Sequence, residues 1–412
     1  MPDCRKVNSI QTTLFGGAGT DLKTVKTSVS SSGSVRIAVL WGELPTYLTA
    51  CLETLQSRYH VDLVVVRMAS SNFLPSETHP YQESAFVGLQ KKLMWDHLGS
   101  DEAQRRTGLQ AYMDDFQPQV VLAGNWAHSP YVTLLPRLRK QGAIVIGCMD
   151  NQWRGTYRQW LMILLRRRWL QDRFDYLWVP GERQAQYATR LGFGADRQLY
   201  GLYVCDSRQF SAVANARFSQ IGHKADWPRR FLFVGRFVEQ KGIGDLLKAY
   251  CLYRSRVSDP WFLHCIGGGP LENLLRSETG VIVEDFRQPS ELVGAFEQAG
   301  IFVLPSRSEP WGVVAHEAAT AGLPLICSSE CGASVEILQD GYNGFLFKPG
   351  DMCGLARLLE YCASETLDLE LMGRRSAHIA QRLTREHWAD YLAEMLQLKT
   401  GIHLSRVNQA PL

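Results

Sequence analysis

The chain has 412 residues, a length that predicts two or three domains, each large enough to bury its own core. Its hydrophobic content of 45% and charged content of 21% are those of an ordinary soluble globular protein. The formal net charge of +3 is too small for a nucleic-acid-binding surface, so we expect no nucleic-acid partner.

Ten cysteines are scattered along the chain, and none forms the close Cys-x-x-Cys pair of a zinc site or redox motif. Most lie in apolar runs such as Leu263-His264-Cys265-Ile266, which indicates small core residues in a reducing compartment. No apolar run approaches the roughly 20 residues that span a bilayer. The N-terminus also lacks the apolar segment of a signal peptide. We therefore expect a cytoplasmic protein.

The N-terminal half begins with a segment rich in serine, threonine and glycine that has no hydrophobic periodicity. We expect residues 1–34 to be a disordered tail. From Val35 onward, apolar runs typical of buried strands alternate with segments of helical spacing. This alternation predicts a doubly wound parallel sheet over residues 35–205. Within it the pattern is weakest after the second strand, where we expect a helix around 86–96.

Polar and aromatic residues follow two of the predicted strands in this half. Asn125-Trp126-Ala127-His128 comes after one strand, and Asp150-Asn151-Gln152-Trp153-Arg154 after the next. Because ligands of open parallel sheets bind at the carboxyl ends of strands, these loops are the predicted contribution of the first domain to a site. Asp150 is the candidate catalytic residue, whereas a lone His128 is more commonly a structural hydrogen-bonding group.

A basic segment with an apolar centre spans residues 153–173. Its six arginines are Arg154, Arg158, Arg166, Arg167, Arg168 and Arg173. The segment has one acid, Asp172, and an apolar block from Trp160 to Leu165. One interpretation is a helix that lies on an anionic membrane surface. The other is a core helix whose arginines form a solvated face or an internal anion site. We favour the core helix, because the long apolar run suits burial on more than one side.

A second domain follows a polar, irregular stretch, which we interpret as a linker over residues 206–229. Strand and helix patterns alternate again over residues 230–384, which predicts a second parallel sheet. Arg236 and Lys241 stand at the carboxyl end of its first strand, where an anion would bind. Arginine offers phosphate a bidentate fork and lysine a mobile point charge. The alternative is ordinary surface charge.

The stretch from Ile301 to Glu317 is the centre of this second domain. It reads as a buried strand, a turn that contains a proline and a glycine, and a helix that opens at Val313. The unpaired N–H groups and positive dipole end of such a helix bind phosphate. Glu309 and Glu317, with seven residues between them, flank this anion site. The alternative is two solvated glutamates beside an ordinary strand–turn–helix unit.

Four motifs in the C-terminal half occur in an order that resembles the retaining glycosyltransferases of group 1 (family 4). They are Val234-Gly235-Arg236 with Lys241-Gly242, Gly267-Gly268-Gly269-Pro270, Leu304-Pro305-Ser306 through Glu309-Pro310-Trp311-Gly312 to His316-Glu317-Ala318, and Gly341-Tyr342-Asn343-Gly344-Phe345-Leu346. The resemblance covers roughly residues 230–350. It implies an α/β protein with two facing Rossmann-like, doubly wound parallel sheets of the GT-B type. It also implies that a final helix, about 385–400, joins the first domain.

The N-terminal half resembles the family only in its alternation of strands and helices. The first turn lacks the paired glycines that are common in the family. Met149-Asp150 stands where many members have a histidine before an aspartate. The first-domain contact with the reaction is therefore not defined by the resemblance, and Asp150 is our candidate.

The resemblance implies roles for individual residues. Arg236 and Lys241 would hold the diphosphate of a nucleotide-sugar donor, Glu309 its sugar and Glu317 its ribose. The other donor-binding residues that it implies are Gly235, Gly269, Phe286 near the base, Pro310, Trp311, Gly312, Val313 and Val314. With Asp150 as the first-domain candidate, the predicted catalytic residues are Glu309, Arg236, Lys241 and Asp150.

The implied reaction moves a sugar from a nucleotide-diphosphate sugar to an acceptor hydroxyl with retention at the anomeric carbon. No metal and no further cofactor are expected, because fixed cations stabilise the departing diphosphate. We expect a saccharide or lipid-linked acceptor, as in polysaccharide, lipopolysaccharide or glycolipid assembly. If the helix over 153–173 lies on a membrane, the protein would be peripheral on the inner face of the cytoplasmic membrane.

Two other functions fit the same sequence. One is another two-domain nucleotide-sugar enzyme, such as an epimerase or a phosphorylase. The other is a non-catalytic protein that binds sugar nucleotides. Analysis of the products formed from a labelled donor distinguishes the three.

Overall fold

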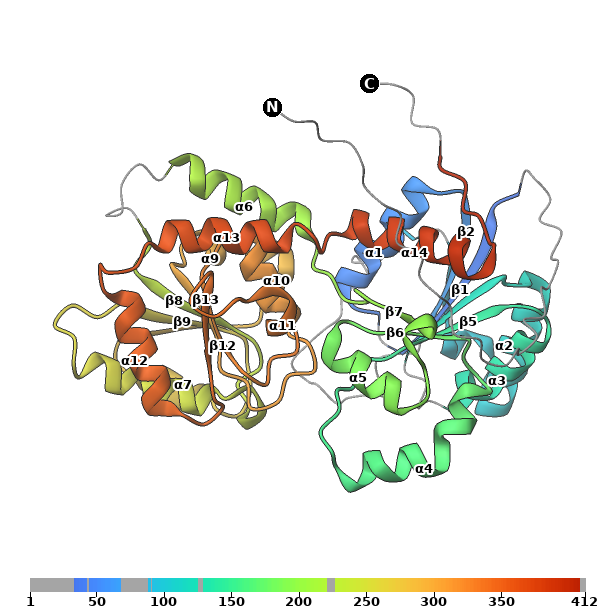
Figure 1. The fold of residues 1–412 in the computed structure, drawn as a ribbon, viewed down its shortest axis with the longest axis horizontal. Helices are drawn as coiled ribbons and strands as arrows, with labels where there is room; N and C mark the ends of the chain where they lie inside the picture. The colour runs from blue at the N-terminus through green and yellow to red at the C-terminus, as the bar shows by residue number, and fades with distance from the viewer. Residues whose placement is uncertain are drawn as a thin grey trace, which may run out of the picture. The chain divides into compact units, whose positions relative to one another are not determined.

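The structure, a computed structural model, describes residues 33–42, 44–67, 88–89, 91–124, 129–220 and 227–407. The sequence predictions for residues 1–32 and for the loop 125–128 lie outside these residues. From Ser34 onward the chain forms one unit by its internal contacts. Two parallel β-sheets, each with helices on both faces, make up this unit, which confirms the predicted α/β fold class (Figure 1).

The first sheet contains seven parallel strands in the order β3-β2-β1-β4-β5-β6-β7. The strands are β1 (Val35–Trp41), β2 (Val61–Arg67), β3 (Lys91–Met94), β4 (Val120–Ala123), β5 (Ile144–Cys148), β6 (Tyr176–Trp178) and β7 (Gln198–Leu199). The helices between them are α1 (Thr46–Arg58), α2 (Glu102–Phe116), α3 (Ser129–Lys140), α4 (Tyr157–Gln171) and α5 (Glu182–Arg190), with short 3-10 turns at Trp95–Leu98 and Ala195–Arg197.

The central strand β1 explains why this half of the chain reads as continuous apolar runs. Ile37 and Val39 face a core cluster that includes α1, whereas Ala38 and Leu40 face a second cluster that includes α2 and α3. Both faces are covered, so every position of the strand can be apolar. The strand order reverses beside β1, and the ligand crevice of such a sheet lies at that point, outside the carboxyl ends of the strands.

The second sheet contains six parallel strands in the order β10-β9-β8-β11-β12-β13. The strands are β8 (Arg230–Val234), β9 (Phe262–Ile266), β10 (Val281–Glu284), β11 (Ile301–Leu304), β12 (Leu325–Ser328) and β13 (Gly344–Phe347). Its helices are α7 (Ile243–Arg254), α8 (Glu272–Arg276), α9 (Val293–Glu297), α10 (Val313–Thr320), α11 (Ser334–Ile337), α12 (Met352–Ala363) and α13 (Leu369–Ala380), with 3-10 turns at Glu239–Lys241 and Pro289–Glu291.

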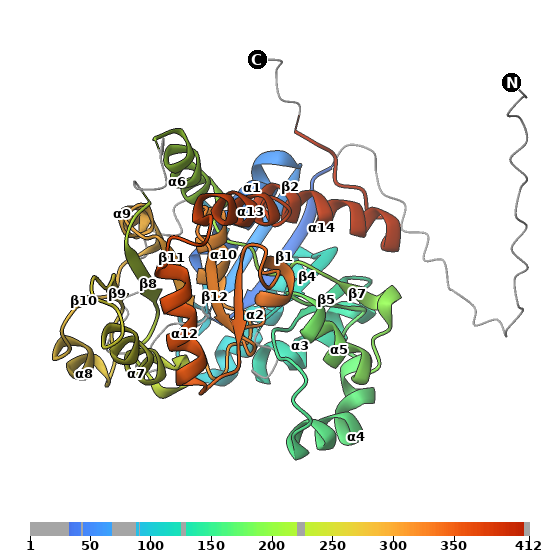
Figure 2. The same cartoon turned by 60° about the vertical axis from the view of Figure 1, so that its left-hand side comes forward.

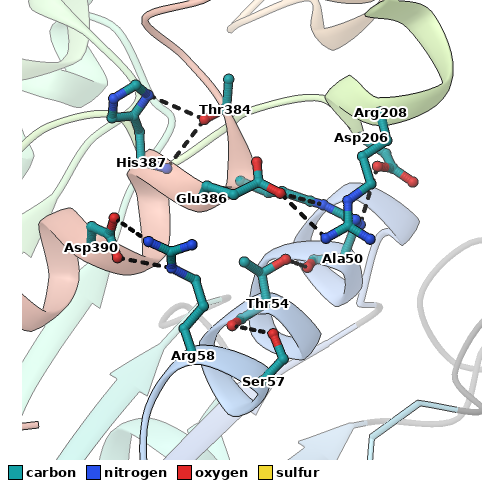
Figure 3. Close-up of polar contacts among 11 residues, drawn as sticks. Ala50, Thr54, Ser57, Arg58, Asp206, Arg208, Thr384, Glu386, His387 and Asp390 are labelled. Carbon is teal, nitrogen blue, oxygen red and sulfur yellow. Dashed lines mark hydrogen bonds and ion pairs between the residues drawn. The ribbon is translucent and has the colours of Figure 1, made fainter. Parts of the chain in front are cut away.

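The last helix, α14 (Arg385–Thr400), returns to the first sheet and packs beside α1 (Figure 2). Its Trp388 ring stacks on Trp178, with ring centroids 4.7 Å apart. The guanidinium of Arg58 donates two hydrogen bonds, of 3.0 and 2.7 Å, to the carboxylate of Asp390 (Figure 3). The chain therefore passes between the two sheets twice, before α6 and before α14.

Two predictions of local structure are wrong. The stretch 206–229 is not irregular throughout, because Ser207–Gln220 forms helix α6, which buries Phe210 and Val213 in the second core. The prediction of a helix around 86–96 is also wrong for the part of that range that the structure describes: Lys91–Met94 forms β3, which pairs with β2, and a 3-10 turn follows. Both segments take their structure from tertiary packing, which a short or polar sequence pattern does not reveal.

The interpretation of the segment 153–173 as a helix buried on more than one side is wrong as well. The helix forms, as α4, but several of its large apolar side chains are exposed to solvent. Within the described part of the chain, no helix is both long enough and apolar enough to cross a membrane.

Candidate functional site

The turn after β11 is fixed to the neighbouring turn after β8. The Arg307 guanidinium donates two hydrogen bonds, each of 2.7 Å, to the Asp245 carboxylate in α7. Gly242 has a positive φ of 67°, and a Cβ on it would lie 2.1 Å from the carbonyl oxygen of Pro305. Only glycine allows this approach. The predicted cation turn and the predicted acid turn are thus held together as one unit.

Glu309 lies inside this unit and is only 6% exposed. Its Oε2 forms an ion pair with Nζ of Lys241 and accepts a hydrogen bond of 3.2 Å from the Ser306 hydroxyl. The structure therefore brings Lys241 and Glu309 into direct contact. Ser306 was not predicted from the sequence, because its role depends on the turn that folds it back onto Glu309.

Arg236 follows β8 at the same edge of the sheet. Its side chain is exposed and has no hydrogen-bond or ion-pair partner among the residues that the structure describes. Behind it the backbones of two turns touch: a Cβ on Gly267 would lie 2.0 Å from the carbonyl oxygen of Gly235. Gly269 similarly lies against the backbone of Phe237. These glycines bring backbones together and leave the Arg236 guanidinium available to an anion.

Helix α10 opens next to Glu309. Gly312 precedes it with φ 93° and ψ 63°, a left-handed conformation that favours glycine. A Cβ at Gly312 would lie 3.1 Å from Cγ of Glu309. The N–H groups of Val313 and Val314 have no hydrogen-bond partner among the described residues, as is usual in a first helical turn. They therefore provide anion-binding donors at the predicted place.

Glu317, one turn into α10, is 7% exposed. Burial, together with the nearby negative charge of Asp206, raises the pKa of its carboxyl group from 4.5 to about 7. Glu317 borders a cavity of about 320 Å³ whose other lining residues are Thr46, Tyr47, Thr49, Ala50, Glu53, Asp206, Gln209, Gln288, Pro289 and Ser290. This lining is rich in hydroxyl, amide and carboxylate groups and suits a neutral ligand with many hydroxyl groups.

Phe286 does not line this cavity. It lies two residues before Gln288, which does, and its side chain is 42% exposed. The cavity instead contains Asp206 and the start of α1, which the sequence analysis did not select. Both are more than 100 residues from Glu317 in the sequence, and only the folded chain brings them to the same cavity.

Asp150 follows β5, as predicted, and is half-buried. Its carboxylate accepts a hydrogen bond of 3.3 Å from the Tyr203 hydroxyl. Burial raises the pKa of Asp150 despite that hydrogen bond, and the negative charge of Glu309 raises it further. The two carboxylates are therefore close enough to interact. Tyr203 was not predicted, since its ring is positioned by packing on Tyr47, with centroids 5.4 Å apart.

Pro310 and Trp311 lie against the first domain. The Pro310 carbonyl accepts a hydrogen bond of 2.5 Å from Nε2 of Gln184 in α5. Trp311 is 2% exposed, and its ring lies close to Gly181. The nearby Ser308 hydroxyl accepts a hydrogen bond of 2.6 Å from Arg154. The Trp311 side chain is thus covered by protein, and a donor contact at Pro310 and Trp311 stays a prediction.

His316 connects α10 to the first crossover. Its Nδ1 accepts a hydrogen bond of 3.1 Å from the backbone N–H of Cys205. Burial lowers the pKa of the imidazole to about 4, so the ring is neutral at physiological pH. Ion pairs join the two crossovers directly: Arg385 lies 3.2 Å from Asp206, and Arg208 lies 3.4 Å from Glu386 (Figure 3). The helix that carries Glu317 is therefore bonded to the segment between the sheets.

No group of three or more histidine, cysteine, aspartate or glutamate side chains that could hold a metal ion occurs in the described ranges. Two cations of the chain, Arg236 and Lys241, lie at this edge of the second sheet. That the reaction needs no metal or cofactor stays a prediction.

Comparison with known families matches residues 215–377 to the family described as "Glycosyl transferases group 1". The chain contains a group 1 glycosyl transferase domain. The matched range includes β8 to β13 and every residue of this half that was predicted to bind the donor, so the resemblance to group 1 is confirmed, and retention stays a prediction.

Curated relatives match over about two fifths of the chain. A glycogen synthase of Mycobacterium tuberculosis (strain ATCC 25618 / H37Rv) is 33% identical over 171 residues, which are 39% of this chain and 39% of that protein. A sulfoquinovosyl transferase of Arabidopsis thaliana is 32% identical over 168 residues, 39% of this chain and 30% of that protein. The chain thus spans well under half the length of these relatives.

Solved structures match over a larger part of the chain. Sucrose-phosphate synthase from Thermosynechococcus elongatus has a TM-score of 0.66 at 17% identity and covers 88% of this chain and 98% of its own. Anabaena HepE, solved with UDP and glucose, has a TM-score of 0.65 at 15% identity and covers 88% of this chain and 99% of its own. At these identities the likeness establishes the two-sheet GT-B fold.

Proposed function

We propose that this protein transfers a sugar from a nucleoside-diphosphate sugar to an acceptor hydroxyl, with retention of configuration at the anomeric carbon. The observation that carries the proposal is the convergence of Glu309, Lys241 and Arg236 beside the opening of α10, the helix that contains Glu317. The glycosyl transferase domain over residues 215–377 supports the reaction class. The UDP and glucose bound to HepE support a nucleotide-sugar donor.

The diphosphate of the donor binds, in this proposal, between Arg236, Lys241 and the N–H groups of Val313 and Val314. When the bond between the anomeric carbon and the diphosphate breaks, negative charge grows on the leaving group. Fixed cations and backbone donors stabilise that charge without reorganisation. Lys241 has three N–H donors, so it can keep its contact with Glu309 while it also serves a phosphate oxygen.

The nucleoside end of the donor lies towards Glu317 and the cavity beside it. An ionised carboxylate accepts hydrogen bonds from both ribose hydroxyls, and the threonine, glutamine and serine side chains of the cavity offer further polar contacts. Asp206, on the same wall, sets how readily Glu317 ionises.

The sugar lies, in this proposal, between Glu309 of the second domain and Asp150 of the first, whose pKa the negative charge of Glu309 helps to raise. The acceptor oxygen attacks the anomeric carbon on the face from which the diphosphate departs, so configuration is retained. The acceptor's proton passes to an oxygen of the leaving diphosphate. Glu309 hydrogen-bonds the sugar, and no covalent protein intermediate is required, in contrast to the paired carboxylates of retaining glycosidases.

We further propose that the acceptor is a saccharide or a lipid-linked saccharide of the kind used in polysaccharide, lipopolysaccharide or glycolipid assembly, met at the cytoplasmic face of a membrane. The nine cysteines that the structure describes are all free thiols, and seven are buried, which supports a reducing compartment. The exposed apolar and basic surface of α4 supports a membrane-associated acceptor.

A donor screen followed by a transfer assay tests the proposal. Nucleotide sugars that differ in base and sugar are first compared by thermal shift, because a ligand that binds only the folded state raises the apparent stability. The best donor, labelled in its sugar, is then incubated with candidate acceptors, and the anomeric configuration of the product is read by NMR.

Glu309→Gln and Lys241→Ala are expected to lower kcat by about 100-fold or more, the scale of losing a fixed group that stabilises transition-state charge. Lys248→Ala serves as the matched control, because Lys248 is an exposed lysine of the neighbouring helix α7. Transfer at the wild-type rate by the Glu309 and Lys241 variants, or a product with inverted configuration, contradicts the proposal.

A further inference from the structure

Helix α4 exposes a stripe of large apolar side chains. The exposed fractions are Tyr157 73%, Trp160 59%, Leu161 51%, Leu164 80% and Leu165 66%. These positions follow the spacing i, i+3, i+4, i+7 and i+8, so the side chains share one face of the helix. Isolated exposed apolar residues are common on protein surfaces, but a contiguous group marks a binding surface.

The opposite face of α4 already packs on the first domain. Met162, Ile163 and Trp169 contact the core cluster beside α2 and α3, and Leu170 is fully buried. The exposed stripe is therefore a second apolar face of the same helix. In both views α4 lies at the edge of the first domain with its outer side uncovered by any described segment (Figures 1 and 2).

The flanks of the stripe are basic. Arg158, Arg167 and Arg168 are exposed, and α4 contains no acidic residue. The Arg158 guanidinium donates a hydrogen bond of 3.0 Å to the Tyr157 hydroxyl. Long basic side chains of this kind lie along apolar surface and keep their charge at its boundary.

We propose that the α4 stripe inserts into the headgroup boundary of an anionic lipid bilayer, with the arginines on the lipid phosphates. Helices that lie in this interface have one apolar face and a basic polar border. A second copy of the chain fits poorly, because a symmetric α4–α4 contact would bring two sets of arginines together with no acid between them. An anionic leaflet supplies both the apolar depth and the opposite charge.

The segment before α4 connects this surface to the candidate site. The Arg154 guanidinium bonds to the Ser308 hydroxyl, one residue before Glu309, at 2.6 Å. Gln159, in the first turn of α4, donates to the carbonyl of Gln152 at 2.7 Å. When α4 is bound to the bilayer, these hydrogen bonds therefore keep the candidate site close to the membrane surface. This deepens the proposed function, on which it rests: the acceptor is a lipid-anchored molecule in an anionic leaflet.

Vesicle sedimentation tests the proposal with the whole protein. Phosphatidylcholine vesicles are compared with vesicles that also contain phosphatidylglycerol, for wild type and for Leu164→Glu/Leu165→Glu. The wild type is expected to bind the anionic vesicles at least tenfold more tightly than the neutral ones, and less tightly as salt rises. The double variant is expected to lose at least tenfold in partitioning to anionic vesicles.

Leu398→Glu is the matched control, because Leu398 is a 69% exposed leucine of another surface helix, α14, and its partitioning is expected to be unchanged. Arg158→Gln/Arg167→Gln/Arg168→Gln is expected to remove the preference for anionic vesicles. Equal binding by Leu164→Glu/Leu165→Glu and wild type overturns the proposal. So does a wild-type dimer, seen by sedimentation velocity, that dissociates in the double variant while vesicle binding is absent.

Donor binding separates this proposal from the proposed function. A nucleotide sugar is expected to shift the melting temperature of Leu164→Glu/Leu165→Glu as much as that of the wild type, because the stripe is outside the donor site. Loss of vesicle binding with an intact donor shift supports the surface. Vesicle binding by a protein that binds no nucleotide sugar would leave the surface supported and overturn the proposed function instead.

Discussion

The ionisation of Glu317 predicts how donor binding depends on pH. Its carboxyl pKa is raised from 4.5 to about 7 by burial and by Asp206. At about 1.4 kcal/mol for each pKa unit, the charged form is disfavoured by about 3 kcal/mol relative to a solvated glutamate. The ionised form accepts hydrogen bonds from the two ribose hydroxyls more strongly than the protonated form. Affinity for a nucleotide sugar should therefore rise with pH through about 7.

The size of this effect follows from the hydrogen bonds at stake. Hydrogen bonds to a charged group contribute about 1.5–3 kcal/mol each, so the rise should be on the order of tenfold between about pH 5.5 and pH 8.5. Isothermal titration calorimetry measures it directly. Glu317→Gln, which resembles the protonated acid, should bind weakly at all these pH values. Asp206→Asn removes the nearby charge and should move the midpoint to lower pH.

The same pKa predicts the pH dependence of folding. Between pH 4.5 and about 7 the folded protein keeps the Glu317 proton while the unfolded chain loses it. The contribution of Glu317 to the free energy of unfolding therefore falls as pH rises through this window, and it is constant above it.

For donor binding, a wild-type affinity that is independent of pH, or one equal to that of Glu317→Gln at high pH, would refute the assignment of Glu317 to the ribose.

Three further predictions concern the unit that holds the site. Lys241→Ala leaves the buried Glu309 carboxylate without its cation and should lower the free energy of unfolding, measured in urea, by about 3–5 kcal/mol. Changing both Lys241 and Glu309 to leucine should cost clearly less than the sum of the two single changes to leucine. Gly242→Ala should destabilise by several kcal/mol, since its Cβ would lie 2.1 Å from a backbone carbonyl oxygen, whereas Gly244→Ala, in α7 with open space at its Cβ, should stabilise by up to about 1 kcal/mol. His316→Leu leaves a buried backbone N–H of the first crossover unpaired and should cost about 1–3 kcal/mol, and His316→Asn, which keeps an acceptor, should recover part of that loss.

Each of these has a clear contrary result in equilibrium urea unfolding. If the double change to leucine at Lys241 and Glu309 lowered the free energy of unfolding by the sum of the two single changes, the ion pair would not act as a unit. Equal stabilities of Gly242→Ala and Gly244→Ala would mean that the turn does not need the left-handed conformation. A His316→Leu protein as stable as the wild type would mean that the crossover does not depend on the imidazole.

The sequence predicted the two sheets well because both faces of each are covered. Every interior strand then reads as an apolar run, as Val35–Trp41 and Ile301–Leu304 do. It failed at α6 and β3, where a polar helix and a four-residue edge strand depend on what they pack against. The prediction for α4 was also wrong, because an apolar run has the same composition whether its side chains face a core or the protein surface.

Within the site, the motif residues could be selected because they are close in sequence. Glu309, Gly312 and Glu317 lie in one strand–turn–helix unit, and local rules of turns and helices place them together. Their partners could not be selected. The bond from Cys205 to His316 joins residues 111 positions apart, and only the folded chain brings them together.

Arg236 offers the most direct test of the donor site, because it is an exposed cation with no partner among the described residues at the exit of β8. The measurement is the affinity of the best nucleotide sugar, by isothermal titration calorimetry, for wild type, Arg236→Ala and a control. Arg256→Ala is the control, since Arg256 is also exposed and pairs with Glu360 on the surface of the second domain. We predict that Arg236→Ala weakens binding by about tenfold or more and that Arg256→Ala leaves it unchanged. Equal affinity in all three proteins would contradict a diphosphate site at this edge of the second sheet.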